Sequence, residues 1–144
     1  MTASITIDQA RIIISEALAR GASVKMKPLA VTVLDAGGHL VAFERQDGAS
    51  FGRFQVGHGK AYGAVALGMG SRALNGAAEA RPHFVQGVNG ALGGALVPVP
   101  GGVLATDGDG NVVGAVGVSG DNSDNDEACA VAGIQAAGLT PVTG

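Results

Sequence analysis

The sequence predicts an α+β fold in which helices pack against an antiparallel β-sheet. Two apolar segments each turn back through an Asp-x-x-Gly motif, at 35–38 and at 107–110, which is typical of β-hairpins. Apolar residues at helical spacing precede the first hairpin, lie between the two and follow the second. This order favours a single domain over residues 1–144, built on one sheet with helices against it.

Composition agrees with a folded domain and excludes several classes of protein. The 144 residues are 47% hydrophobic and 15% charged, with a net charge of −3. We therefore expect a globular protein that binds no nucleic acid, because no basic cluster is present. No apolar run approaches ~18 residues and no secretory signal is visible, so we expect a cytoplasmic protein that does not enter a membrane. The single cysteine, Cys129, permits no internal disulfide.

The first half of the chain is predicted to form a helix, a hairpin and a second helix. Thr6 and Gln9 match a capping box, and Gly21 is a natural residue to follow the first helix. The second helix carries Phe54 and His58 on one stripe and contains four glycines, each of which costs ~1 kcal/mol against alanine. Close packing on the sheet or on a partner subunit would explain that cost. The predicted elements are a helix over 7–20, strands over 29–34 and 39–45, and a helix over about 51–68.

The second half combines short helices with the second hairpin and a final helix. Ser123 and Asp126 resemble a capping box with Ser123 as N-cap, and Pro141 ends any continuation of the final helix. The predicted elements are helices over 71–76 and 82–88, a loop over 89–95, strands over 96–99, 102–106 and 111–119, and a helix from 123 to about 137.

Standard catalytic and metal-binding motifs do not occur in the sequence. The segment from Asp107 to Asn111 resembles the start of a calcium-binding loop, but Val112 stands where that loop requires glycine. We predict a hairpin turn there and no metal site. The carboxylates 121, 124, 126 and 127 suit the N-terminus of the last helix, with attraction of a metal cation as the less favoured alternative.

A candidate anion site is formed by two cations and two glycine-containing turns. Arg45 ends a strand and Lys60 lies in a helix with few other charges, so either could bind a carboxylate or phosphate group. A salt bridge at the surface or at an interface is the alternative for both. The turns are Pro100-Gly101-Gly102 and Ser119-Gly120, whose backbone N–H groups favour anions.

The three histidines are candidates for a haem ligand or a general base. His39 follows a hairpin turn, where we expect exposure to solvent. His58 lies on the apolar stripe of its helix, where a structural role in the core or an interface is the alternative. His83 stands beside Arg81 at a helix start. Cys129 is expected to be buried, and no residue is assigned a catalytic role.

The sequence resembles the GlcG/HbpS-like family, which includes the C-terminal domain of PduO-type proteins. The resemblance spans about residues 5–138 and rests on motifs in a fixed order. These motifs are Leu34-Asp35-Ala36-Gly37-Gly38-His39-Leu40-Val41, Arg45-x-Asp47-Gly48-Ala49, Gly59-Lys60-Ala61, Leu96-Val97-Pro98-Val99-Pro100-Gly101-Gly102 and Gly114-Ala115-Val116-Gly117-Val118-Ser119-Gly120.

This resemblance implies a profilin-like domain with a central five-stranded antiparallel sheet flanked by helices. It also implies assembly into dimers and often octamers, and binding of haem. The resemblance implies a haem-ligating histidine near the start of PduO-type domains, whereas residues 1–38 contain none, so that ligand cannot be carried over to a position in this chain. His39, His58 and His83 stay open as candidate ligands from their own settings. We therefore expect a small-ligand-binding homo-oligomer that takes haem or a related tetrapyrrole. The alternatives are an enzyme or binder of a small organic acid, acting through Arg45, Lys60 and the glycine turns, and a structural oligomer without activity.

Overall fold

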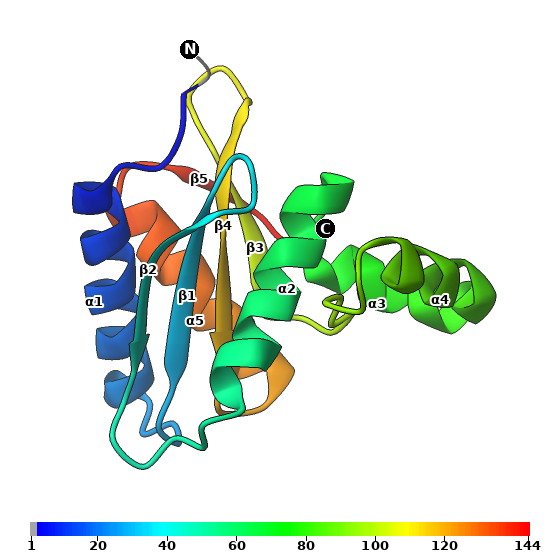
Figure 1. The fold of residues 1–144 in the computed structure, drawn as a ribbon. Helices are drawn as coiled ribbons and strands as arrows, with labels where there is room; N and C mark the ends of the chain where they lie inside the picture. Colours follow the sequence, from blue (N-terminus) through cyan, green and yellow to red (C-terminus); the bar gives the residue numbers. More distant parts are fainter. Residues whose placement is uncertain (1–2) are drawn as a thin grey trace.

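The computed structural model describes residues 3–144 and has the predicted α+β architecture (Figure 1). The five strands form one sheet in the order β2-β1-β4-β3-β5, and every neighbouring pair is antiparallel. Within residues 3–144, no helix is long and apolar enough to cross a membrane. The elements are α1 (Ile7–Ser23), β1 (Ala30–Asp35), β2 (Leu40–Arg45), α2 (Arg53–Leu67), α3 (Ser71–Ala80), α4 (Pro82–Ala91), β3 (Gly102–Thr106), β4 (Val112–Ser119), α5 (Ser123–Ala136) and β5 (Thr140–Val142).

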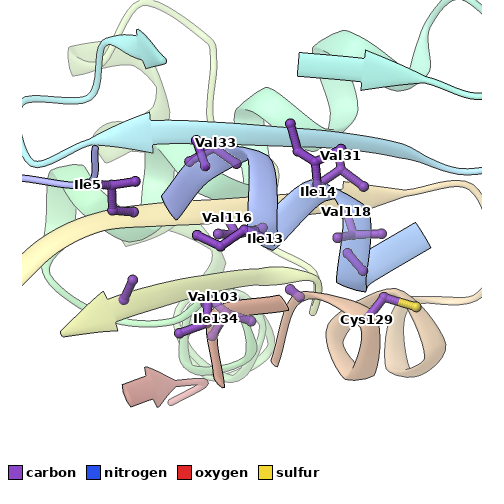
Figure 2. Packing of buried hydrophobic residues seen from close by; sticks show 14 of the residues in the cluster. Ile5, Ile13, Ile14, Val31, Val33, Val103, Val116, Val118, Cys129 and Ile134 are labelled. Carbon is purple, nitrogen blue, oxygen red and sulfur yellow. The ribbon is translucent and has the colours of Figure 1, made fainter. Parts of the chain in front are cut away.

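Helices cover both faces of the sheet. Helices α1 and α5 lie on one face and α2 lies on the other, while α3 and α4 extend away from the sheet beside α2 (Figure 1). The main core lies between the sheet and the α1–α5 layer (Figure 2). Its fully buried side chains come from alternate positions of the central strands and from both helices, as expected for a sheet with a different layer on each face. They include Ile13, Ile14, Val31, Val33, Val116, Val118 and Ile134.

The two hairpin turns have the same hydrogen-bonding scheme. Asp35 Oδ1 accepts from the backbone N–H groups of Gly37 and His39, each at 2.9 Å. Asp107 Oδ1 accepts at the same distance from the N–H groups of Asp109 and Asn111. The predicted hairpins are thus confirmed, and both turns lie at one end of the sheet (Figure 1). The candidate ligand-binding residues lie toward the other end.

Glycines let α2 approach the sheet at backbone distance. A Cβ on Gly117 in β4 would overlap the carbonyl oxygen of Gly57, and a Cβ on Gly57 would lie 3.2 Å from the carbonyl oxygen of Gly117. A Cβ on Gly63 would overlap the side chain of Leu96. Of the two explanations offered for these glycines, packing on the sheet therefore accounts for Gly57. The absence of a side chain at Gly63 makes room for the segment that contains Leu96.

Two strand predictions need correction. Residues 96–99 form no strand, because Pro98 and Pro100 lack N–H donors and Leu96 is buried instead against Leu74 and Val85. No strand is predicted after the last helix, yet the segment from Thr140 to Val142 forms β5. Proline is tolerated there because β5 is an edge strand that pairs only with β3.

Several helix ends differ from those predicted. The N-cap of α5 is Asn122, which accepts from Asn125 N–H at 2.9 Å, rather than Ser123. Helix α1 continues past Gly21 to Ser23, and glycine stands at 21 because a Cβ there would meet Leu29. Helices α3 and α4 likewise run to Ala80 and Ala91, beyond their predicted ends at 76 and 88.

Candidate functional site

The two glycine turns singled out from the sequence lie side by side, where β3 begins and β4 ends. The N–H of Val118 donates to the carbonyl of Gly101 at 2.9 Å, and Gly102 pairs with Gly117. All five residues of the two turns are buried: Pro100, Gly101, Gly102, Ser119 and Gly120. The structure brings these residues together, but as an internal junction rather than an open surface.

Packing explains why glycine stands at these turns. Gly101 has φ +122°, and a Cβ there would lie 2.7 Å from Lys60 Nζ. A Cβ on Gly102 would overlap the backbone of Lys60. Gly120 has φ +152°, and its Cβ would overlap the carbonyl of Pro28. The turns therefore make room for Lys60 and for the segment before β1.

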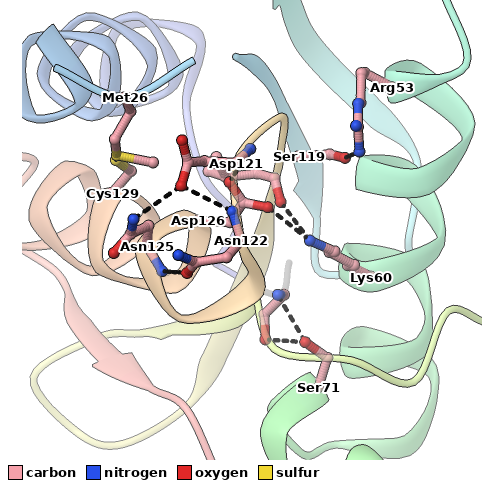
Figure 3. Close-up of polar contacts among 12 residues, drawn as sticks. Met26, Arg53, Lys60, Ser71, Ser119, Asp121, Asn122, Asn125, Asp126 and Cys129 are labelled. Carbon is pink, nitrogen blue, oxygen red and sulfur yellow. Dashed lines mark hydrogen bonds and ion pairs between the residues drawn. The ribbon is translucent and has the colours of Figure 1, made fainter. Parts of the chain in front are cut away.

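Lys60 is held inside the protein by two oxygen atoms. Its Nζ donates to Asp126 Oδ2 at 3.1 Å and to the carbonyl of Val118 at 2.9 Å (Figure 3). The two charged side chains are only 3% and 2% exposed. Burial is the largest influence on both groups, lowering the pKa of Lys60 and raising the pKa of Asp126, while their mutual attraction opposes both shifts. Lys60 thus forms a salt bridge, but one buried inside the protein rather than at the surface or at an interface.

Arg53, which sequence reasoning did not select, lies at the same junction. It is the first residue of α2, and its Nη1 donates to Ser119 Oγ at 3.2 Å (Figure 3). It lines a hollow of about 240 Å³ together with Lys27, Pro28, Ser50 and Gly120. The available signal was a basic residue three positions after Ser50, near the start of a predicted helix.

Arg45 lies in an adjoining hollow at the end of β2. This larger hollow, of about 610 Å³, is lined by Met26, Lys27, Pro28, Arg45 and Gln46, among others. The two hollows share Lys27 and Pro28. Arg45 and Lys60, predicted to act together, are therefore in different settings: Arg45 is exposed at a hollow, and Lys60 is buried in an ion pair.

The three histidines occupy three different environments. His39 is exposed on the first hairpin turn, with Nδ1 3.3 Å from Asp35 Oδ1. His83 is exposed on the first turn of α4. His58 is half-buried on α2, with its ring 5.6 Å from the rings of both Phe54 and Tyr62.

His58 also lines a hollow with mainly apolar walls. The hollow measures about 290 Å³, and its walls include Phe54, Val56, Ala95 and Val97. The rings of Phe54 and Phe43 in turn meet in a T-shaped arrangement, with 4.9 Å between centroids. Helix α2 thus presents a histidine within a row of aromatic rings, beside an apolar space.

The acidic residues around α5 are engaged with protein groups. Arg72 forms ion pairs with both Asp124 and Glu127. Asp121 accepts from the N–H of Lys27 and from Asn122 and Asn125, which lowers its pKa to about 2. Across residues 3–144, no group of three or more His, Cys, Asp or Glu side chains is arranged to hold a metal ion.

Cys129 is fully buried and has a thiol that resists ionisation. Burial raises its pKa to about 11, with a further contribution from the charge of Asp126. Its sulfur lies 3.4 Å from that of Met26. The structure confirms the predicted burial, and a thiol of this kind is a poor nucleophile at neutral pH.

This sheet, its helical layers and its buried turns define a small α+β domain of the profilin-like class. The chain belongs to the HbpS-like family: the family model described as "Haem degrading protein HbpS-like" matches residues 5–135. A comparison with curated proteins gave no significant match.

Several solved structures share the fold at low sequence identity. The crystal structure of a PduOC–haem complex has a TM-score of 0.84 at 23% identity, covering 94% of this chain and 96% of that one. The protein ORFY of Klebsiella pneumoniae has a TM-score of 0.85 at 22% identity, covering 96% and 93%. A double mutant of HbpS from Streptomyces reticuli has a TM-score of 0.79 at 24% identity, covering 94% and 88%.

Proposed function

We propose that the protein binds haem or a related tetrapyrrole, with His58 as the iron ligand. The carrying observation is that His58 is the one histidine of the three to line an apolar hollow. The description of the family, and the haem in the PduOC complex, support the same ligand. His39 and His83, the other candidates, lie on exposed surface away from this hollow.

The residues around His58 suit a haem group. Imidazole is a common axial ligand of haem iron, and apolar walls suit the macrocycle. The flanking rings of Phe54 and Tyr62 restrict how the imidazole can turn. Bound haem would supply a redox-active iron, while this chain would supply the ligand and the apolar wall.

The size of the hollow favours a shared site in a homo-oligomer. At about 290 Å³ it lies at the lower limit of ligand pockets, which span roughly 300–1,000 Å³, so part of a macrocycle would protrude. A second copy of the chain would cover that part. We therefore propose a dimer or a larger assembly such as an octamer, which light scattering after size-exclusion chromatography would test with and without hemin.

Titration with hemin tests the assignment of His58. We expect a saturable shift of the Soret band in the wild type and in the matched controls His39→Ala and His83→Ala. His58→Ala should lose the shift, and added imidazole should restore it by taking the place of the missing ring. If His58→Ala binds hemin like the wild type, or if the wild type gives no saturable shift, the proposal is wrong.

The alternatives make different predictions in the same experiments. A structural oligomer would assemble without a Soret shift. An organic-acid function built on Lys60 has less support, because Asp126 and Val118 already occupy its ammonium group. A cytoplasmic location stays a prediction, which fractionation of cells that express the chain would test.

A further inference from the structure

We propose that the hollow beside the start of α2 binds a small organic carboxylate between Lys27 and Arg53. The hollow measures about 240 Å³, and its lining contains these two basic residues, the hydroxyl-bearing Ser50 and no acidic residue. It shares no lining residue with the hollow of His58. The proposal is therefore independent of haem binding.

Arg53 is oriented by the protein but lacks an acidic partner. Its Nη1 donates to the hydroxyl of Ser119, a fully buried residue, and this hydrogen bond directs the guanidinium group (Figure 3). Within residues 3–144, neither Arg53 nor Lys27 nor Arg45 has a carboxylate within ion-pair distance. A guanidinium group held in this way retains further N–H donors for a carboxylate ligand.

The nearby carboxylates lie outside the walls of this hollow. Asp121 accepts hydrogen bonds from Lys27 N–H and from residues 122 and 125 and stays ionised, so its negative charge offsets part of the charge of Lys27 and leaves Arg53 as the main cation of the site. Asp126 is paired with Lys60, whose ammonium group lies close enough to Arg53 for the two charges to repel. Asp47 lines the larger adjoining hollow and not this one. An anion in the smaller hollow would meet two cations and no carboxylate in its walls.

The adjoining hollow indicates the class of acid. It measures about 610 Å³, shares the wall formed by Lys27 and Pro28, and is lined by Arg45 and by one acidic residue, Asp47. A ligand with one carboxylate beside Arg53 and a second in this hollow would meet Arg45 there. This second cation favours a dicarboxylate over a single small anion, and Arg suits a planar carboxylate through bidentate contact.

Amide chemical shifts measured by NMR would test this site on the haem-free protein. The probes are malonate, succinate, acetate and inorganic phosphate, all at one fixed ionic strength because exposed charges are screened by salt. The variants are Arg53→Gln, Arg53→Lys and Lys27→Gln. Arg11→Gln is the control, since Arg11 is exposed on α1 and lies outside the lining of both hollows.

We expect malonate or succinate to shift the amides of Gly48, Ser50 and Gly120 in a saturable way. Arg53→Gln should weaken binding by roughly tenfold or more, as loss of a charged hydrogen bond implies. Arg53→Lys should fall between Arg53→Gln and the wild type, and Arg11→Gln should match the wild type. The proposal is overturned if no carboxylate shifts these amides, if Arg53→Gln binds as the wild type does, or if phosphate binds as tightly as the dicarboxylates.

Discussion

Lys60 Nζ lies 3.1 Å from Asp126 Oδ2, and this ion pair joins α2 on one face of the sheet to α5 on the other. The contact is made around the end of β4, whose Val118 carbonyl accepts a second hydrogen bond from Lys60. The remaining oxygen of Asp126 accepts from the N–H of Asp121 at 3.0 Å. The pair therefore links three elements and the turn that follows β4.

Removing Lys60 alone should destabilise the protein strongly. Lys60→Met leaves the buried carboxylate of Asp126 without its cation, and breaking such a pair costs about 3–5 kcal/mol of unfolding free energy. The double variant Lys60→Met/Asp126→Asn should recover much of this loss, because neither charge is then buried. Urea unfolding would measure both, with the exposed Lys25→Met as control. Equal stability of Lys60→Met and the wild type would show that the pair contributes little.

The local elements could be predicted from sequence because their signals are local. The capping box of Thr6 and Gln9 is present, with both hydrogen bonds formed. The turns at Asp35 and Asp107 use the side-chain acceptors that their sequences indicate. By contrast, β5 could not be predicted, because three residues containing Pro141 become a strand only when β3 offers them an edge.

The sequence indicated only some of the contacts among the candidate site residues. Gly101 and Gly102 do lie against Lys60, whereas Gly120 packs against Pro28 and Leu29. Nothing local indicates that Asp126 would reach Lys60 across 66 positions. The same holds for Arg53 and Ser119, whose contact depends on how α2 crosses β4. Side-chain pairing between distant elements is set by packing, which sequence patterns do not contain.

Alanine should have opposite effects on stability at two glycines: Gly117, which packs against Gly57, and Gly76, whose Cβ space is empty. Gly117→Ala should destabilise the protein by ~1–3 kcal/mol or more, because its Cβ would overlap the Gly57 carbonyl and push α2 from the sheet. Gly76→Ala should stabilise it by up to ~1 kcal/mol, since Gly76 lies within α3 and nothing occupies the space of its Cβ. Denaturant unfolding measures both, and a neutral Gly117→Ala would contradict the close approach.

Asp121 should make the protein sensitive to acid in a defined range of pH. Its pKa is lowered from 3.8 to about 2, chiefly by the N–H of Lys27. A carboxylate with a lowered folded-state pKa contributes stability above its unfolded pKa, and this contribution is lost as the pH falls toward the folded value. Wild-type stability should therefore fall between pH 3.8 and about 2 more steeply than that of Asp121→Asn.

A matched control for Asp121 is the exposed Asp109→Asn. Asp109 lies on the second hairpin turn. Its backbone N–H donates a hydrogen bond to the side chain of Asp107, and this is the hydrogen bond that Asp109 makes there. This variant should follow the wild-type pH profile in urea unfolding. Parallel profiles for Asp121→Asn and the wild type would remove the assigned role of the Asp121 hydrogen bonds.

Cys129 should react with thiol reagents only when the protein opens. The residue is fully buried beneath α1, and burial raises its pKa to about 11, so at neutral pH it is both covered and protonated. We expect Ellman's reagent to label the native protein at the rate of unfolding, and to label the urea-unfolded protein at once. Lys60→Met should speed labelling of the native protein, because a destabilised structure opens more often. As a control, Gly76→Ala should not speed it. Rapid stoichiometric labelling of the folded wild type at neutral pH would contradict both the burial and the raised pKa.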